Sequence, residues 1–215
     1  PILEENIMSN VLFIKANSRP LSQAVSVQLY EAFLQSYKES HPEDSITELD
    51  LFSENLPYYG ADMINGMFKL GKGIELSSDE QAATVTVKKY LDQFLSADKV
   101  VLAFPLWNFT VPAVLHTYMD YLCQAGTTFK YTPEGPVGLL SDKKVALLNA
   151  RGGVYSEGPA ASKEMAVNYV TTILDFFGIN NVKNIIIEGH NQFPEQASEI
   201  IENGIREAAT AANTF

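Results

Sequence analysis

The fold is decided by the stretch Val100-Val101-Leu102-Ala103-Phe104-Pro105-Leu106-Trp107-Asn108-Phe109-Thr110-Val111-Pro112. It opens with an unbroken apolar run of strand character that stops at Pro105. A loop with Trp, Asn and Phe follows, and Pro112 begins a helical pattern. In open α/β folds such loops lie at the carboxyl ends of the strands, where ligands bind. The loop therefore offers ring faces, an amide and backbone N–H groups to one flat molecule with polar edges.

The rest of the chain alternates predicted strands with predicted helices. Strands are expected at Val11–Ile14, Ile46–Leu51, Lys99–Phe104, Val145–Asn149 and Val182–Glu188. Helices are expected at about Ser22–Ser40, Ala61–Leu70, Ser78–Ala97 (capped by Ser78-Asp79), Pro112–Gln124, Ala160–Phe177 and Pro194–Asn213, with a hairpin or ordered loop at Gly126–Leu140. Most of the strands are apolar throughout, which predicts a parallel sheet covered on both faces. We expect a flavodoxin-like, three-layer α/β sandwich with a five-stranded parallel sheet in the order 2-1-3-4-5.

Composition narrows the class of protein. The 215 residues contain no linker and no repeat, which predicts one domain over residues 8–215, with residues 1–7 as a short leader before Met8. The net charge of −11 argues against a nucleic-acid partner. No apolar run is long enough for a membrane span. The single Cys123 and the lack of a secretion signal predict a cytoplasmic protein.

The histidines and one glycine-rich stretch suggest no further chemistry. His41, His116 and His190 lack metal-ligand spacing, so no metal site is expected, and His116 is predicted to pack in the core. Gly66-Met67-Phe68-Lys69-Leu70-Gly71-Lys72-Gly73 almost spells a nucleotide phosphate loop. Gly73 stands where that motif needs Ser or Thr, and no buried strand precedes it. The stretch is therefore predicted to be a flexible surface loop.

The turn after the first strand carries Asn17, Ser18, Ser22 and Ser26. One interpretation is a phosphate cradle of hydroxyls, an amide and helix N-terminal N–H groups. The alternative is ordinary helix capping, for which Ser22 is well placed. In a flavodoxin-like sheet this turn lies at the point where the strand order reverses, which favours the phosphate.

Ala150-Arg151-Gly152-Gly153 follows the fourth strand at the same sheet edge. Two glycines let backbone amides approach a planar ligand closely. Arg151 is expected to stabilise negative charge on a reduced flavin, a ligand with the flat, polar-edged shape that the Trp107 loop suits. The alternative is an ordinary glycine-containing loop with a solvated arginine.

Four motifs together resemble one family. They are Lys15-Ala16-Asn17-Ser18-Arg19-Pro20, Phe104-Pro105-Leu106-Trp107-Asn108-Phe109, the segment from Phe129 to Leu139 (FKYTPEGPVGL) and Ala150-Arg151-Gly152-Gly153. In combination they are similar to the motifs of the bacterial FMN-dependent NADH:azoreductases, most of all the Bacillus-type members. The resemblance extends from Met8 to Phe215 and implies a homodimer with two FMN molecules at the subunit interface.

The resemblance also implies roles for individual residues. Asn17, Ser18 and the segment Ala24-Val25-Ser26 would hold the FMN phosphate. Ala24 stands where some members have a second serine, so backbone N–H groups or Ser18 must compensate. The isoalloxazine ring would be lined by Pro105, Leu106, Trp107, Asn108 and Phe109 and contacted at its polar edge by Ala150, Arg151, Gly152 and Gly153. Substrates would stack against Phe109 and against Tyr131 and Phe176 of the partner subunit.

The implied activity is hydride transfer through FMN. NADH, or alternatively NADPH, would deliver hydride, and an azo compound or a quinone would then accept it in a ping-pong scheme. No catalytic side chain is expected, because solvent can supply protons. Two other functions remain open: a flavodoxin-like electron carrier and a flavin-free binding module on the same fold.

Overall fold

The computed structural model describes residues 7–215. Of the predicted leader, residues 1–6 lie outside the described residues. The five-stranded sheet consists of β1 (Asn10–Lys15), β2 (Ser45–Asp50), β3 (Lys99–Pro105), β6 (Lys144–Arg151) and β7 (Asn181–Glu188). All neighbouring strands are parallel, in the order β2-β1-β3-β6-β7. The predicted order is confirmed, because β4 (Phe129–Thr132) and β5 (Gly135–Gly138) form a separate hairpin.

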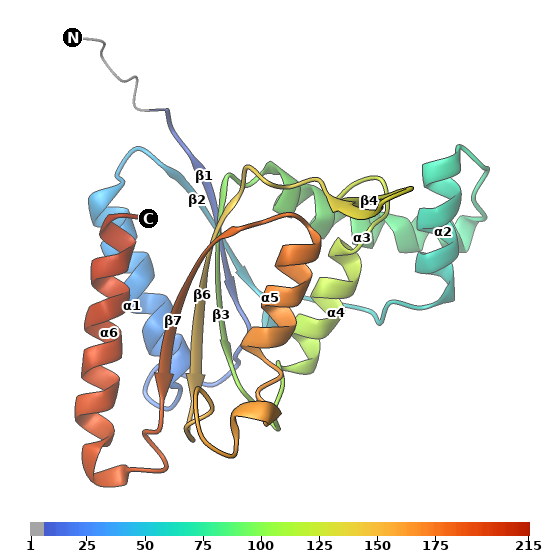
Figure 1. The fold of residues 1–215 in the computed structure, drawn as a ribbon. Coiled ribbons are helices and arrows are strands. Elements are labelled where there is room, and N and C mark those ends of the chain that lie inside the picture. The colour runs from blue at the N-terminus through green and yellow to red at the C-terminus, as the bar shows by residue number, and fades with distance from the viewer. Residues whose placement is uncertain (1–6) are drawn as a thin grey trace.

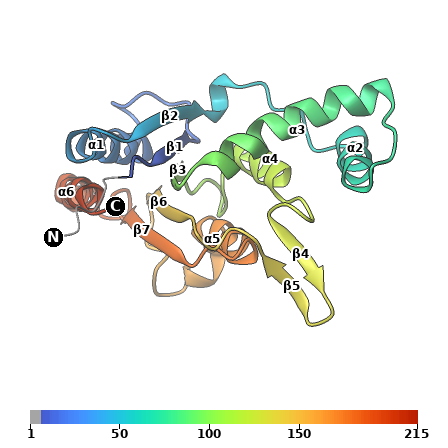
Figure 2. The same ribbon diagram turned by 90° about the horizontal axis from the view of Figure 1, so that it is seen from above.

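Helices cover both faces of the sheet (Figure 1). The helices are α1 (Val25–Ser40), α2 (Ala61–Lys72), α3 (Ser78–Ser96), α4 (Ala113–Leu122), α5 (Val167–Phe176) and α6 (Ala197–Asn213), and three short 3₁₀ turns lie at Leu51–Ser53, Ala161–Lys163 and Pro194–Gln196. Helices α1 and α6 lie on one side, and α3, α4 and α5 on the other (Figure 2). Helix α2 and the hairpin lie away from the sheet, beyond this second layer.

The two-sided core follows from the alternation of side chains along each strand. In β1, Val11 and Phe13 pack with the α1 and α6 side, whereas Leu12 and Ile14 pack with the α3, α4 and α5 side. A strand with both faces buried must be apolar on both faces, as the buried residues Val11–Ile14 of β1 are. Full burial of one such side chain contributes about 1.5–3 kcal/mol.

The start of α1, the cap of α3 and the start of α5 differ from the prediction, and α4 and α6 begin at Ala113 and Ala197 instead of Pro112 and Pro194. Helix α1 begins at Val25, not near Ser22, because the N–H groups of Gln23 and Ala24 turn back to the carbonyl of Pro20. Helix α3 is capped by Ser77, not by Ser78-Asp79: the Ser77 hydroxyl accepts from the Glu80 N–H and the Glu80 carboxylate accepts from the Ser77 N–H.

Helix α5 begins at Val167 and not at Ala160. The Glu164 carboxylate accepts hydrogen bonds from the N–H groups of Ala166, Val167 and Asn168 and so fixes the start of the helix. The predicted end of this helix agrees better, since Gly178 follows it with a φ of +79°.

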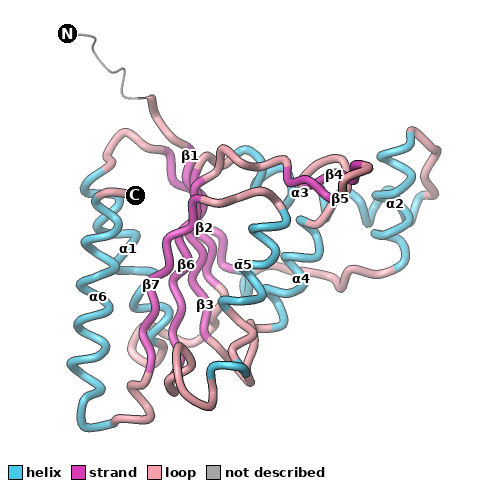
Figure 3. The backbone as a smooth tube through the Cα atoms, in the orientation of Figure 1, coloured by secondary structure: helices cyan, strands magenta, loops and turns pink. Residues whose placement is uncertain are grey.

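The predicted flexible loop at Gly66–Gly73 is wrong. Residues 66–72 belong to α2, and only Gly73, with a φ of +67°, ends the helix. Gly66 is a packing glycine, because a Cβ there would lie 2.6 Å from the Thr84 side chain of α3. Within residues 7–215, no helix combines the length and apolar character that crossing a membrane requires. Figure 3 shows how the loops at the carboxyl ends of the strands gather at one edge of the sheet.

Candidate functional site

A cavity of about 360 Å³ lies at this carboxyl edge. Its walls come from the chain just after β1, β3, β6 and β7 and from the first turn of α1. The lining residues are Asn17, Arg19, Gln23, Ala24, Val25, Ser26, Pro105, Leu106, Trp107, Ala150, Arg151, Gly152, His190 and Asn191. The predicted segments around Asn17, Trp107 and Gly152 therefore meet in one cavity, because the carboxyl ends of parallel strands lie at the same edge of the sheet.

Some predicted residues lie off this wall, and others were missed. Ser18, Asn108, Phe109 and Gly153 do not line the cavity. The cavity wall also includes Arg19, Gln23, His190 and Asn191, which were not predicted as site residues. His190 and Asn191 could have been predicted from the sequence. They belong to Gly189-His190-Asn191-Gln192, which follows the fifth predicted strand at the same edge of the sheet.

The first turn of α1 presents free donors to the cavity. Its N-cap is Ala24, whose side chain cannot accept a hydrogen bond. Within residues 7–215, the backbone N–H groups of Val25 and Ser26 have no protein acceptor. Such N–H groups and the positive end of the helix dipole attract an anion. Ser22, the alternative cap, is exposed and does not cap the helix.

Asn17 and Ser26 form a buried polar pair at the floor of this turn, 3% and 2% exposed. The Asn17 Nδ2 donates to the Ser26 Oγ at 2.9 Å, and the Asn17 Oδ1 accepts from the Arg19 N–H at 2.9 Å. Because the Ser26 hydroxyl accepts from Asn17, its own proton is left to donate. No acceptor for that proton is found within the described residues. Asn17 thus orients a hydroxyl donor beside the two free N–H groups.

The Trp107 loop is a tight turn held by its own backbone. The N–H and carbonyl groups of Trp107 and Thr110 exchange hydrogen bonds of 2.9 and 3.1 Å, and the Leu106 N–H donates to the Ala150 carbonyl at 3.0 Å. Asn108 and Phe109 have φ values of +50° and +74°. Left-handed backbone in two successive non-glycine residues is strained and is typical of functional loops.

A second cavity, of about 550 Å³, adjoins the first across Trp107. It is lined by Tyr58, Tyr59, Trp107, Asn108, Thr110, Val111, Pro112, Ala113, His116, Thr117 and Asp120. The His116 side chain is 55% exposed and stacks on Tyr169, with ring centroids 4.9 Å apart. The prediction that His116 packs in the core is therefore wrong. It lies on the outward face of α4.

Arg151 is buried beneath the cavity instead of being solvated. Its guanidinium lies 3.3 Å from a Glu164 carboxylate oxygen and 3.1 Å from a Glu188 carboxylate oxygen. Burial by itself raises the pKa of Glu188, but hydrogen bonds from Ser156 and Tyr155 and the Arg151 charge outweigh it and keep that pKa below its ordinary value. Two carboxylates contact one guanidinium, so the positive charge of Arg151 is already compensated by Glu164 and Glu188. The expectation that it stabilises a negative ligand is not supported by this arrangement.

His190 adds a neutral ring to the cavity wall. Burial lowers the pKa of His190, which keeps the imidazole uncharged at neutral pH. Its Nδ1 is buried and has no hydrogen-bond partner within the described residues. Within residues 7–215, no group of three or more His, Cys, Asp or Glu side chains is arranged to hold a metal ion.

Tyr131 and Phe176 do not reach the cavity of their own chain. Tyr131 is 72% exposed on the hairpin and packs edge-on against Phe129, which in turn contacts Phe176 at a centroid distance of 4.3 Å. The hairpin is anchored where Gly138 meets Gly178, because a Cβ on Gly138 would lie 2.0 Å from the Gly178 nitrogen. The hairpin lies away from the sheet (Figure 2), with Tyr131 exposed on it while Phe129 and Phe176 pack against the core.

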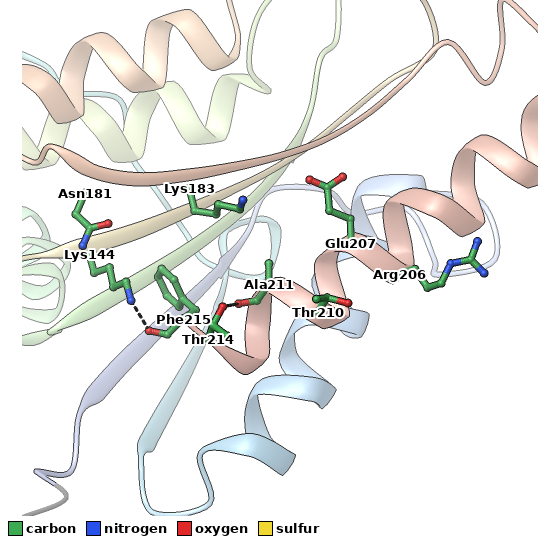
Figure 4. Close-up of a pocket in the computed structure, with 9 residues that line it drawn as sticks. All are labelled: Lys144, Asn181, Lys183, Arg206, Glu207, Thr210, Ala211, Thr214 and Phe215. Atoms are coloured by element: carbon green, nitrogen blue, oxygen red, sulfur yellow. Dashed lines mark hydrogen bonds between the residues drawn. The ribbon is translucent and has the colours of Figure 1, made fainter. Parts of the chain in front are cut away.

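A third cavity, of about 520 Å³, lies at the opposite, amino edge of the sheet (Figure 4). Lys144 there donates to the Phe215 carbonyl at 2.8 Å, and Lys183 extends beside Glu207, whereas Arg206 points away from them. The lysines thus have oxygen neighbours from the chain itself. No predicted site residue lies here.

Fold and cavity together define a flavodoxin-like protein, and the sequence profile of the flavodoxin-like fold family matches residues 9–211. FMN-dependent NADH:quinone oxidoreductase 4 of Bacillus cereus is 67% identical over 208 residues, which cover 97% of this chain and 100% of that protein. FMN-dependent NADH:quinone oxidoreductase 1 of Bacillus subtilis is 60% identical over the same shares. The chain belongs to this family, and the resemblance predicted from its loop motifs is confirmed.

Solved structures agree with this assignment. The crystal structure of azoreductase from Bacillus anthracis has a TM-score of 0.95 and 66% identity, covering 97% of this chain and 100% of that one. An FMN-dependent NADH-azoreductase from Bacillus anthracis, determined in complex with FMN, has a TM-score of 0.87 and 30% identity, covering 96% and 99%.

Proposed function

We propose that this chain is an FMN-dependent NADH oxidoreductase that reduces quinones and azo compounds. Relatives that match 96–97% of the chain are named for these activities. We further propose that residues 8–215 form one FMN-binding domain of a cytoplasmic homodimer, without a nucleic-acid or membrane partner. The single cysteine supports a reducing, cytoplasmic compartment, and the net charge of −11 argues against a nucleic-acid partner.

The observation that carries the proposal is the donor set at the start of α1. A phosphate needs acceptor-free N–H groups and a hydroxyl proton, and Val25, Ser26 and the Asn17–Ser26 pair supply them at a helix N-terminus. The 360 Å³ cavity is within the range of small-molecule sites, roughly 300–1,000 Å³. These donors fit FMN, whose phosphate is its only strongly anionic group.

The remaining lining residues suit the flavin ring. The isoalloxazine would lie along Pro105, Leu106 and Trp107, with its polar edge toward the backbone of Ala150 and Gly152. Arg151 would contribute main-chain contacts only, because its guanidinium is paired. Asn108, Phe109 and Gly153 would border the ring from outside the cavity wall, and exposed Ser18 would lie beside the phosphate.

Bound FMN supplies hydride transfer, and the chain supplies binding and orientation. The N–H groups of α1 hold the phosphate, and the Trp107 turn fixes the ring beside the second cavity. That cavity and the exposed ring of Phe109, 42% accessible, offer stacking surface to a flat donor or acceptor. No side chain is assigned a proton-transfer role. NADH is the proposed donor, with NADPH as the alternative.

Dimerisation would complete the substrate pocket. Tyr131 is exposed, Phe176 is partly buried beside Phe129, and neither Tyr131 nor Phe176 lines the 360 Å³ cavity of its own chain. We propose that each subunit lends these two residues to the other. An interface that forms an active site is expected to bury about 2,000 Å² or more in total.

The test is to identify the cofactor and then the kinetic pattern. Protein purified and heated should release a flavin with the mass and fluorescence of FMN. With NADH and a quinone or azo dye, double-reciprocal plots at several acceptor concentrations should be parallel, as expected when donor and acceptor use one site in turn. FAD, or no flavin after reconstitution, would refute the proposal. A stable semiquinone without acceptor turnover would instead identify an electron carrier.

A further inference from the structure

The Arg151 guanidinium is the centre of a buried ionic cluster. The side chains of Arg151, Glu164 and Glu188 are 3%, 6% and 20% exposed. They come from the end of β6, the approach to α5 and the end of β7. Three such charges are costly to bury unless each is paired and hydrogen-bonded. Each carboxylate is indeed bonded to further groups, and those groups belong to the loops at the cavity.

Glu164 connects the cluster to the Trp107 turn. Its carboxylate holds the N–H groups of Ala166, Val167 and Asn168 at 3.0, 2.7 and 3.0 Å. The next residue, Met165, donates its N–H to the Phe109 carbonyl at 2.8 Å and accepts from the Thr110 hydroxyl at 3.1 Å. The strained backbone of the turn thus rests on the segment that Glu164 holds.

Glu188 connects the cluster to the glycine loop. Its carboxylate accepts from the N–H groups of Tyr155 and Ser156, at 2.9 and 3.2 Å, and from the Ser156 hydroxyl. The Tyr155 ring packs edge-on against Phe109 at a centroid distance of 6.4 Å. Both carboxylates therefore act on the same turn from two directions.

The backbone next to Arg151 holds the third loop. The Arg151 carbonyl accepts from the Gly189 N–H at 3.2 Å, and the Gly152 carbonyl accepts from the N–H groups of Asn191 and Gln192 at 3.0 Å each. The loops after β3 and β6 are therefore connected to the Arg151 guanidinium through Glu164 and Glu188, whereas the loop after β7 is held by the backbone of Arg151 and Gly152.

We propose that Arg151 is a positioning residue: by bridging Glu164 and Glu188, its guanidinium fixes the loops after β3 and β6 that border the flavin ring. This inference rests on the proposed function only for the identity of the ligand. A planar guanidinium offers several donors in a fixed fork and can bridge two carboxylates, whereas a lysine ammonium is a point charge on a flexible stem. Position 151 then requires the planar, forked shape of a guanidinium, and a positive charge alone does not suffice.

The test compares Arg151→Lys with Arg151→Met, with Arg206→Lys on the outer face of α6 as the matched control. Amide hydrogen exchange of the cofactor-free protein should be faster at Tyr155, Ser156 and residues 166–168 in both Arg151 variants. The dissociation constant for FMN should rise roughly tenfold or more in both. The visible circular dichroism of bound FMN should change, and the control should match the wild type in every measurement.

The two Arg151 variants distinguish the explanations. If Arg151→Lys behaves like the wild type and only Arg151→Met loses FMN, charge is what matters and the inference is wrong. If neither changes, Arg151 has no role in the loops. Should Arg151→Lys fail to fold, Glu188→Gln should speed exchange at Tyr155 and Ser156 but leave residues 166–168 protected, and uniform exchange would overturn the inference. Wild-type protein that binds no FMN refutes the proposed function alone, because exchange is measured without cofactor.

Discussion

Ser22 and Ser26 lie close together in the sequence but have different roles in the structure. From the sequence either one suits a helix start or a phosphate. In the structure the turn at Pro20 delays α1 until Val25, so Ser22 stays in the exposed turn and Ser26 enters the first helical turn. Only Ser26 is oriented by a buried partner, Asn17.

Removing the Ser26 hydroxyl should therefore weaken FMN binding. A hydrogen bond to a charged group contributes about 1.5–3 kcal/mol, so Ser26→Ala should raise the FMN dissociation constant by roughly 10- to 150-fold. Fluorescence titration of the cofactor-free protein measures this constant directly. Ser22→Ala is the control and should bind like the wild type. Equal losses in both variants would place the phosphate elsewhere.

The position of helix α2 depends on its contacts with α3. Helix α2 lies away from the sheet and is held to α3 by Gly66 packing and by a charged pair. Lys69 of α2 donates to both carboxylate oxygens of Glu80, at 2.9 and 2.8 Å, while Glu80 also completes the capping box of α3. One carboxylate thus serves two helices.

This arrangement predicts a pH-dependent stability. Hydrogen bonds from Lys69 and from the Ser77 backbone lower the pKa of Glu80 below its ordinary value of 4.5. A lowered pKa means that the contribution of Glu80 is complete above that value and is lost as the pH falls through the lower, folded pKa. Urea unfolding between about pH 7 and pH 3 should show a shallower dependence in Glu80→Gln than in the wild type.

The matched control is Glu75→Gln, at an exposed residue with no ion pair or hydrogen bond in the described part of the chain. Its unfolding curve should follow the wild type at each pH. If Glu80→Gln keeps the wild-type slope in acid, the Lys69–Glu80 pair does not couple α2 to α3.

At the scale of the whole molecule, the hairpin is the feature that one chain alone does not explain. Its Gly138–Gly178 contact fixes it to the body, and yet Tyr131 lines none of the three cavities described above. A shared active site would account for both facts.

Subunit mixing tests this sharing. Chains with Ser26→Ala and chains with Tyr131→Ala should each be impaired alone. A mixed dimer would contain one doubly altered site and one intact site, so unfolding and refolding an equal mixture should restore about a quarter of wild-type activity. Without restoration, Tyr131 would act within its own subunit. Light scattering at about the 23.7 kDa of one chain would contradict the dimer itself.

The sequence by itself determined the layered fold, the strand order and the edge at which ligand loops gather. Those properties depend on local periodicity: apolar strands such as β1 and amphipathic helices are written in consecutive residues. The same local patterns placed the Asn17, Trp107 and Gly152 segments at one edge. The family motifs added the cofactor and the chemistry.

Only the tertiary structure decided how individual polar groups are used. Arg151 is neutralised by Glu164 and Glu188, which are 13 and 37 residues away in the chain and meet it only after folding. The exposure of His116 and the packing of Gly66 were likewise hidden. Pairing energies depend on distance and burial in three dimensions, and a one-dimensional pattern carries neither.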